Sequence, residues 1–435
     1  MVKKALIWAA MPFVVKNEIN YDDRFLQNAI REGWSHCEMQ GDFLLKHINT
    51  SFAKNIVCFS KKCDNLSLMV PTRGSLDSSG ADNHCVAISH VDVYCFDTGI
   101  GICTMQIPCD CDTEESVLVD TCSLLHCSVR HSDEKNGKAV FLNGTKTYLS
   151  CIAEEFLDNL LGQSYTLFGT FNDTSLQRVN MFSAVLCDKS GEDNSSEPYN
   201  KWCYLLANAY DTRDTGLSVD DQHCYHQHAY IRWSFSKRGC AAVANLTGTA
   251  LNDEFLNHRW FVSMGKNYFY SYLIVLHQKL ASYYYLNKIA EDPSMNHLEM
   301  NQKSLIEFNS KYVFSIISDE PFVQNVYLNL KQASNADEVY AELLEQLRRM
   351  FDYARLKSNE ADEVKNHKLN LISVIIAVVC SISIVFDSIE LFKSYGCEFG
   401  FQSAWNIIFT IVVAIEIVIF LLFLFFTIFS NKKNK

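Results

Sequence analysis

The chain has 435 residues, a net charge of −12 and a hydrophobic content of 48%. This apolar content excludes an intrinsically disordered chain, and the acidic balance disfavours nucleic acid as a direct partner. The 17 cysteines show no spacing typical of a disulfide framework, so we expect mostly buried free thiols.

Residues 1–263 are predicted to form a sheet-rich α/β domain that is a candidate for ligand sensing. The apolar run 5–15 follows two lysines and resembles a short signal peptide. Pro12 interrupts this run and Lys16 follows at once, so we predict a buried first strand. Turn signals at 97–99 and 237–239 predict two hairpins. Further strands are expected at 66–71, 85–96, 101–108, 165–170, 179–187, 202–209, 229–235 and 240–246.

From residue 264 the pattern becomes helical. We predict a helical subdomain over 264–335, followed by a stalk helix over 336–368 that continues into the next segment. The stalk carries apolar and small residues at alternating spacings of four and three, which is a heptad seam. Its partner is either another subunit or a neighbouring helix. The seam consists of Tyr340, Leu344, Leu347, Phe351, Ala354, Ser358 and Ala361.

Two apolar runs near the C-terminus predict a transmembrane hairpin. The expected spans are 369–392 and 404–429, joined by a short external loop at 393–403 and followed by a basic tail at 430–435. Flanking lysines predict that both termini lie in the cytoplasm, in a two-span protein of the inner (plasma) membrane. The predicted fold class is therefore an α+β cytosolic domain followed by a long stalk helix and a two-helix transmembrane hairpin.

Polar residues within these runs are candidate pore residues. Asn370, Ser373 and Ser381 belong to a small and polar stripe, which either lines a water-filled path or allows close helix packing. Asp387 and Glu390 would form acidic rings in a symmetric assembly. Glu416 lies near the middle of the second run, where a carboxylate is costly and suggests a functional site. The alternative is that Glu416 is protonated, or that it forms a structural hydrogen bond.

The order of these segments is similar to that of CorA-type divalent-cation channels. The signature of that family, Tyr/Phe-Gly-Met-Asn after the first span, corresponds here to Tyr395, Gly396, Cys397 and Glu398. The resemblance covers roughly residues 260–435. It implies a homo-oligomer, with a pentamer preferred, in a lipid bilayer and with Mg²⁺ as a permeant or regulatory ion. Replacement of the family's Asn by Glu398 puts the usual magnesium selectivity in doubt.

The large divergent N-terminal domain resembles the branch of CorA-like membrane effectors found beside type III CRISPR systems. That resemblance implies a cation channel for antiviral defence, gated by a nucleotide-type messenger such as an S-adenosylmethionine–AMP conjugate. A magnesium transporter is the alternative, and a membrane-anchored receptor or enzyme with a non-conducting hairpin is the second. No nucleophile elbow or phosphate loop is present, so we predict that the chain is not an enzyme.

Aromatic and cationic residues of the N-terminal part are weak candidates for ligand binding. They are the types that stack on a base and neutralise a phosphate, and they are equally typical of core aromatics and surface charges. This set consists of Trp202, Tyr204, Arg232, Trp233, Trp260, Lys266 and Tyr268. The dense group His223, Cys224, His226 and His228 is a further candidate for metal binding, although no second ligand pair has suitable spacing.

Overall fold

The computed structural model divides the chain into two compact units, Met1–Arg348 and Arg349–Lys435. The first unit contains the sheet and most of the helices, and the second contains the remainder of the last long helix. The structure describes residues 2–16, 21, 23–71, 83–109, 113–130, 138–167, 178–188, 197–213, 223–291, 295–394, 404, 406–408, 410–412, 414–415 and 418.

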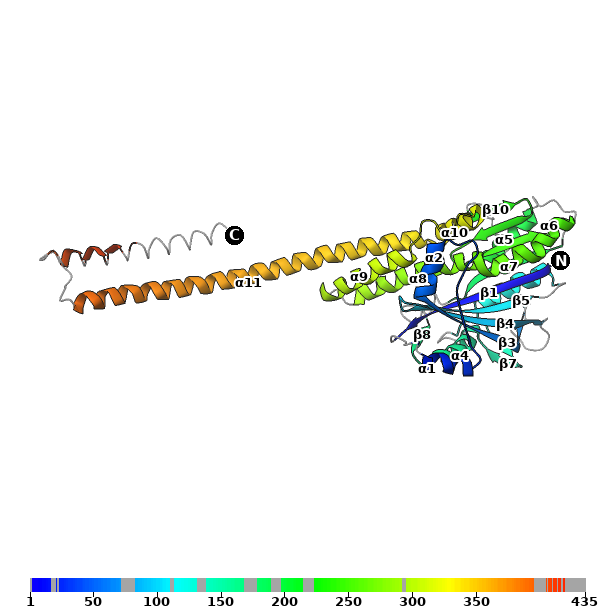
Figure 1. The fold of residues 1–435 in the computed structure, drawn as a ribbon, viewed down its shortest axis with the longest axis horizontal. Coiled ribbons are helices and arrows are strands. Elements are labelled where there is room, and N and C mark those ends of the chain that lie inside the picture. The colour runs from blue at the N-terminus through cyan, green and yellow to red at the C-terminus, as the bar shows by residue number, and fades with distance from the viewer. Residues whose placement is uncertain are drawn as a thin grey trace. The chain divides into compact units, whose positions relative to one another are not determined.

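The first unit is organised around one mixed sheet (Figure 1). Ten of its twelve described strands follow the order β10-β11-β12-β9-β1-β5-β4-β3-β6-β7, and off this path β2 pairs with β3 and β8 pairs with β1. The pairing of β12 with β9 is parallel, and the other described pairs are antiparallel. The strands are β1 (Val2–Val15), β2 (Ser35–Cys37), β3 (Ile56–Pro71), β4 (Asn83–Phe96), β5 (Ile100–Cys109), β6 (Val140–Leu142), β7 (Thr145–Thr147), β8 (Tyr165–Leu167), β9 (Asn180–Cys187), β10 (Cys224–His228), β11 (Ile231–Phe235) and β12 (Gly239–Asn245).

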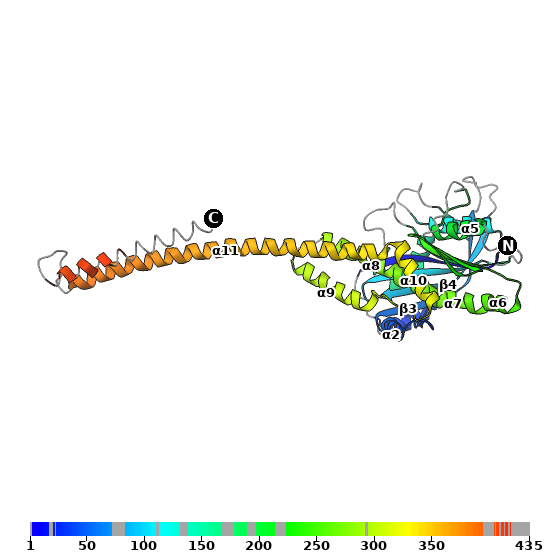
Figure 2. The same ribbon diagram turned by 90° about the horizontal axis from the view of Figure 1, so that it is seen from above.

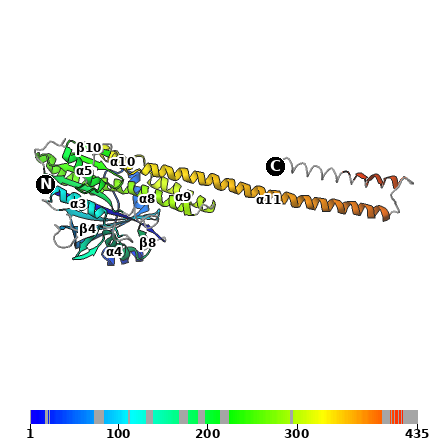
Figure 3. The same cartoon turned by 180° about the vertical axis from the view of Figure 1, so that it is seen from behind.

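Helices cover both faces of this sheet. On one face, α3 contacts β1 and β9, α4 contacts β5 and β8, and α5 contacts β11 and β12 (Figure 3). On the other face, α8 contacts β5, and α10 contacts β10 and β11. Figure 2 shows α5 and α7 on opposite sides of the sheet. The helices are α1 (Asp23–Arg31), α2 (Lys46–Asn55), α3 (Glu115–His126), α4 (Leu149–Leu161), α5 (Glu197–Asn208), α6 (Ala250–Glu254), η3 (Phe255–Trp260), α7 (Phe261–Ser263), η4 (Met264–Tyr268), α8 (Phe269–Glu291), α9 (Met295–Tyr312), α10 (Pro321–Ser334) and α11 (Ala336–Ser394).

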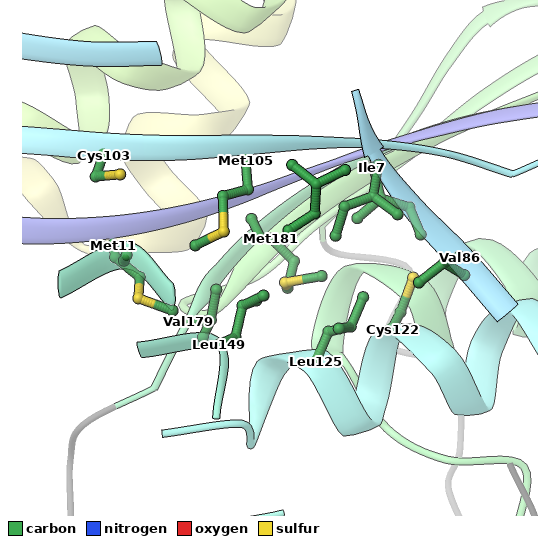
Figure 4. Close-up of a cluster of buried hydrophobic side chains, with 14 of the residues drawn as sticks. Ile7, Met11, Val86, Cys103, Met105, Cys122, Leu125, Leu149, Val179 and Met181 are labelled. Atoms are coloured by element: carbon green, nitrogen blue, oxygen red, sulfur yellow. The ribbon is translucent and has the colours of Figure 1, made fainter. Parts of the chain in front are cut away.

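Strand β1 lies inside the sheet, between β5 and β9, and is buried on both faces. Ile7 and Met11 point into the core on the α3 side, where Figure 4 shows them with Cys122 and Leu125 of α3. Trp8 points the other way and its ring stacks on Phe269 of α8, with centroids 5.1 Å apart. A strand that packs on both faces is expected to be apolar throughout, which is why this run resembles a signal peptide. The prediction of a buried first strand is confirmed.

Most predicted elements of the first unit are present. The hairpin between β4 and β5 turns at Gly99, whose φ of 81° is favourable only for glycine, and the β11–β12 hairpin turns at 237–239. The strand predicted at 202–209 is wrong, because these residues belong to α5. Cys203, Leu206 and Ala207 are buried there at helical spacing, and their contact with the sheet outweighs the β-propensity of the aromatic residues.

The predicted membrane hairpin is contradicted. Over the part of the chain that the structure describes, no helix has the length and apolar content needed to cross a bilayer. The prediction took the apolar run at 369–392 as a span, although α11 carries Asn370, Asp387 and Glu390 among its apolar residues. The span at 369–392, the membrane part of the fold class and the inner-membrane location with cytoplasmic termini are therefore corrected. Most of the second predicted span, 404–429, lies outside the described residues.

The predicted stalk helix corresponds to α11, which begins at Ala336. Within the first unit, Leu343 and Leu347 of α11 are buried, and the Tyr340 ring lies 6.1 Å from that of Phe308 in α9. Leu344 is 44% exposed, so it is not part of this contact. Of the early seam residues, Tyr340 contacts a neighbouring helix of the same chain and Leu347 is buried, whereas Leu344 is not, and the buried Leu343 lies outside the predicted seam. The oligomer that the seam also predicted stays a prediction.

The contact between β1 and α8 provides a test of the fold. Trp8 is 2% exposed and touches both Phe269 and Phe182, so Trp8→Ala removes a large side chain from a closed interface. We expect the free energy of unfolding in urea to fall by about 3–5 kcal/mol. Leu251→Ala is the control, because Leu251 is 77% exposed and its removal should cost under about 0.5 kcal/mol. Similar values for the two variants would contradict the packing of α8 on β1.

Candidate functional site

A pocket lies where the β11–β12 turn meets α8 and the end of α10. Its cavity volume is about 20 Å³, within about 290 Å³ of non-atom space that includes open solvent. The turn, the helix α8, the last residues of α10 and the first residue of β9 all contribute to its walls. The lining residues are Asn180, Ser236, Lys237, Arg238, Gly239, Tyr272, Val275, Leu276, Lys279, Leu330 and Ser334.

The turn that forms one wall is held by hydrogen bonds. Ser236 Oγ accepts the backbone N–H groups of Arg238, at 3.0 Å, and of Gly239, at 3.1 Å. The same hydroxyl donates to the carbonyl of Ala207 in α5, at 2.7 Å. Gly239 is required because a Cβ there would overlap the carbonyl oxygen of Met181 on the parallel strand β9. The backbone of the turn is therefore fixed before any ligand binds.

Three cationic side chains line the pocket. Lys279 Nζ donates to the carbonyl of Lys237, at 3.2 Å. Burial, with a smaller effect from the charge of Lys237, lowers the pKa of Lys279 to about 8. The guanidinium of Arg238 lies over the Tyr210 ring, 5.1 Å from its centroid, and donates to the carbonyl of Asn208. None of the described residues that line the pocket is acidic, so its lining is strongly positive.

Tyr272 adds a buried hydroxyl to the same wall. Its side chain is 4% exposed, and its hydroxyl has no hydrogen-bond partner among the described residues. Burial, assisted by the nearby Cys240, raises the pKa of Tyr272 well above its ordinary value, so the hydroxyl stays protonated. A buried donor without an acceptor costs free energy.

The pocket borders the junction between α10 and α11. Leu330 and Ser334 line the pocket, and α10 ends at Asn335, whose backbone is left-handed with a φ of 57°. Across this junction, Lys331 Nζ lies 2.6 Å from a carboxylate oxygen of Asp337 in the first turn of α11. A ligand that moved the end of α10 would therefore act on the start of α11.

The residues predicted to bind a ligand do not form one site. Trp233 of β11 and Tyr268 of η4 are joined through Gln227, which accepts from the Trp233 indole and donates to the Tyr268 hydroxyl, both at 2.9 Å. Trp202 and Tyr204 lie on α5, which covers the opposite face of the sheet from Tyr268. Arg232 and Trp260 are buried, whereas Lys266 is exposed. Most of these residues pack the core.

The predicted pore residues fall in the second unit. Ser373, Asp387 and Glu390 lie on α11 and are exposed. Asn370 and Ser381 also lie on α11, and their side chains are outside the described residues. The remaining predicted pore residues, which are Tyr395, Gly396, Cys397, Glu398 and Glu416, also lie outside the described part of the chain.

The histidine-rich segment forms part of β10. Its His228 ring lies 5.5 Å from that of Tyr230 and 4.8 Å from that of Phe322 in α10. Among the residues that the structure describes, no group of three or more His, Cys, Asp or Glu side chains is arranged to hold a metal ion. These contacts are those of a histidine packed among aromatic rings.

The pocket residues were missed by sequence reasoning. Residues 237–239 were recognised only as a turn, and Tyr272 and Lys279 only as part of a helix. The sequence contains only a weak signal for the pocket. Tyr272 and Lys279 are seven residues apart, so they share one face of α8, and the turn contributes two further cations. Nothing in the sequence places that helix face on that turn.

The fold and the pocket define an α+β protein with one large mixed sheet and a positively charged site at a hairpin turn. Comparison of the chain with protein-family models, with curated proteins and with solved structures gives no match. The resemblance to CorA-type channels therefore stays a prediction from the sequence.

Lys279 makes the pocket testable through its effect on stability. The folded-state pKa is near 8 and the ordinary value is 10.5, so between these values the unfolded chain binds more protons than the folded chain. The contribution of Lys279 to the free energy of unfolding therefore rises with pH over this window. We expect Lys279→Met to be more stable than wild type by about 1 kcal/mol at pH 7 and to lose this advantage by pH 10.

This difference is measured by urea unfolding at several pH values in a buffer without phosphate. Lys62→Met is the matched control, because the Lys62 side chain is 71% exposed and forms a surface ion pair with Asp64. A difference between Lys279→Met and wild type that stays constant from pH 7 to pH 10 would show that the Lys279 amine is not buried.

Proposed function

We propose that residues 1–348 form a ligand-sensing domain that binds a small molecule carrying a phosphate group in the pocket at the β11–β12 turn. The observation that carries this proposal is the charge of the pocket: three cations and a buried hydroxyl donor, with no acid among the described lining residues. Arg binds phosphate oxygens through parallel N–H donors, and Lys binds them as a point charge.

A nucleotide-type messenger is the ligand class that we propose first. The apolar side chains of Val275, Leu276 and Leu330 lie beside the cations, so the lining suits a molecule with an anionic group attached to a less polar body. The same positive lining disfavours Mg²⁺ as the ligand of this pocket. The ion-conducting role predicted from the sequence depended on two membrane spans and is not part of the proposal.

Ligand binding in the pocket is proposed to act on the rest of the chain through the C-terminal end of α10. A phosphate held by Arg238 and Lys279 would lie beside Leu330 and Ser334, one residue before the left-handed Asn335. Binding is thus proposed to change the α10–α11 junction and, through the ion pair of Lys331 with Asp337, the first turn of α11. The long helix α11 would be the output element of the sensor.

The proposal predicts binding that depends on phosphate. Adenosine 5′-monophosphate at saturating concentration should raise the melting temperature of the full chain, whereas adenosine, which lacks the phosphate, should not. We expect Arg238→Gln and Lys279→Met each to weaken AMP binding about tenfold or more in calorimetric titration, because each removes one charge-assisted contact. Lys62→Gln is the control and should bind as wild type does.

Two outcomes separate the parts of the proposal. Equal binding of AMP and adenosine, or unchanged affinity in both pocket variants, would refute a phosphate site. Hydrogen exchange on the bound protein then tests the output: we expect slower exchange at residues 330–340 when AMP is present. Binding without this change would contradict the role of α11 and leave the pocket intact.

A further inference from the structure

Two cysteines face each other at the outer edge of β3. In the antiparallel pairing of β2 with β3, Cys37 lies directly opposite Cys58, in register with the pair Ser35 and Ser60. Residues directly opposite each other point to the same face, with Cβ atoms about 4.5–5.5 Å apart. A disulfide requires Cα atoms about 4.4–6.8 Å apart, so this pair needs only a small adjustment to form one. Both are free thiols in the structure.

The two thiols differ in exposure in the way that a reactive pair requires. Cys37 is half-buried and open to small molecules, whereas Cys58 is buried behind it at 5% exposure. Cys37 Sγ is 3.6 Å from the carbonyl of Ser35 and 3.9 Å from its hydroxyl. The Ser35 hydroxyl is held in turn by donation to the carbonyl of Ser60, at 2.9 Å. The reactive atom therefore lies in a fixed polar setting.

Hydrogen-bond donors around Cys37 favour its thiolate. The hydrogen bond from the Cys58 thiol is the largest influence, and with the Ser35 and Ser60 hydroxyls it lowers the pKa of Cys37 to about 6, against the opposing effects of burial and of Asp92. Asp92 on β4 acts on Cys37, and burial raises the pKa of the Asp92 carboxyl. Burial also raises the pKa of the nearby phenols of Tyr94 and Tyr270. Thiolates, rather than thiols, react with peroxides and disulfides.

We propose that Cys37 and Cys58 form a redox modification site, in which a small hydroperoxide converts the two thiols into a disulfide that links β2 to β3. The Cys37 thiolate attacks one oxygen of hydrogen peroxide, which breaks the O–O bond and gives a sulfenic acid and hydroxide. Cys58 sulfur then attacks Cys37 sulfur and displaces a second hydroxide. The Cys58 proton and the proton released earlier by Cys37 convert both hydroxides to water. Overall, two thiols are oxidised and one peroxide is reduced to two waters.

This site is separate from the pocket proposed above, because β2 and β3 lie on the far side of β1, β5 and β4 from the β11–β12 turn. The Cys37–Cys58 site is connected to the helices of the first unit through the segment that follows β2. There, the Phe43 N–H donates to the Asn267 side chain, and the Leu45 N–H donates to the carbonyl of Ile317. A disulfide at Cys37 would fix the start of the segment that joins the sheet to these helices.

The test uses the full chain with all its cysteines. The reduced protein is treated with stoichiometric hydrogen peroxide, free thiols are blocked with N-ethylmaleimide, and the unreduced digest is mapped by mass spectrometry. We expect a linked peptide containing Cys37 and Cys58, formed about tenfold faster than exposed Cys85 is oxidised. Absence of that linked peptide while Cys85 is oxidised would overturn the proposal, and this measurement needs no variant.

Variants then assign the two roles. In Cys58→Ser, and in Cys58→Ala if the serine variant is unstable, the sulfenic acid at Cys37 should accumulate and be trapped by dimedone. Cys151→Ser is the matched control, because Cys151 is half-buried on α4 and should leave the linked peptide unchanged. A dimedone adduct at Cys37 that forms no faster than one at Cys85 would refute Cys37 as the attacking thiol.

Discussion

The fold depends on the burial of β1 from both sides. Ile7 and Met11 point toward α3, and Trp8 points toward α8. Because β5 and β9 pair with its two edges, β1 also satisfies its backbone hydrogen bonds within the sheet. The β3–β5 half and the β9–β12 half of the sheet are thus joined by one strand, and both helical layers pack against it.

The position of the candidate pocket follows from this arrangement. Phe269 at the start of α8 is fixed on Trp8, so the turns of α8 that follow carry Tyr272 and Lys279 toward the far half of the sheet. The parallel pairing of β12 with β9 places Gly239 against Met181 and holds the hairpin turn there. The cations lie close together because helix α8 packs against the β11–β12 turn. Burial of Lys279 in this contact lowers its pKa.

Local features of the fold were predictable from the sequence, whereas contacts across it were not. Pro12 and Lys16 argued against a signal peptide, and Gly99 marked a turn, because these residues act through their own backbone or charge. The pocket draws on residues near 180, 237, 272 and 330. The parallel β12–β9 pairing that joins the first two leaves no local signal in the sequence. The membrane span predicted at residues 369–392 was wrong, because no helix in the described part of the chain has the length and apolar content needed to cross a bilayer.

The place of β1 in the chain order has a consequence for synthesis on the ribosome. Its partners are β5, at Ile100–Cys109, and β9, at Asn180–Cys187, so both edges are completed only after the ribosome has passed β9. At about 5–20 residues per second, that delay is on the order of ten seconds or more. Until β9 has been made, at least one edge of this largely apolar strand stays unpaired, which makes the nascent chain a substrate for chaperones and a risk for aggregation.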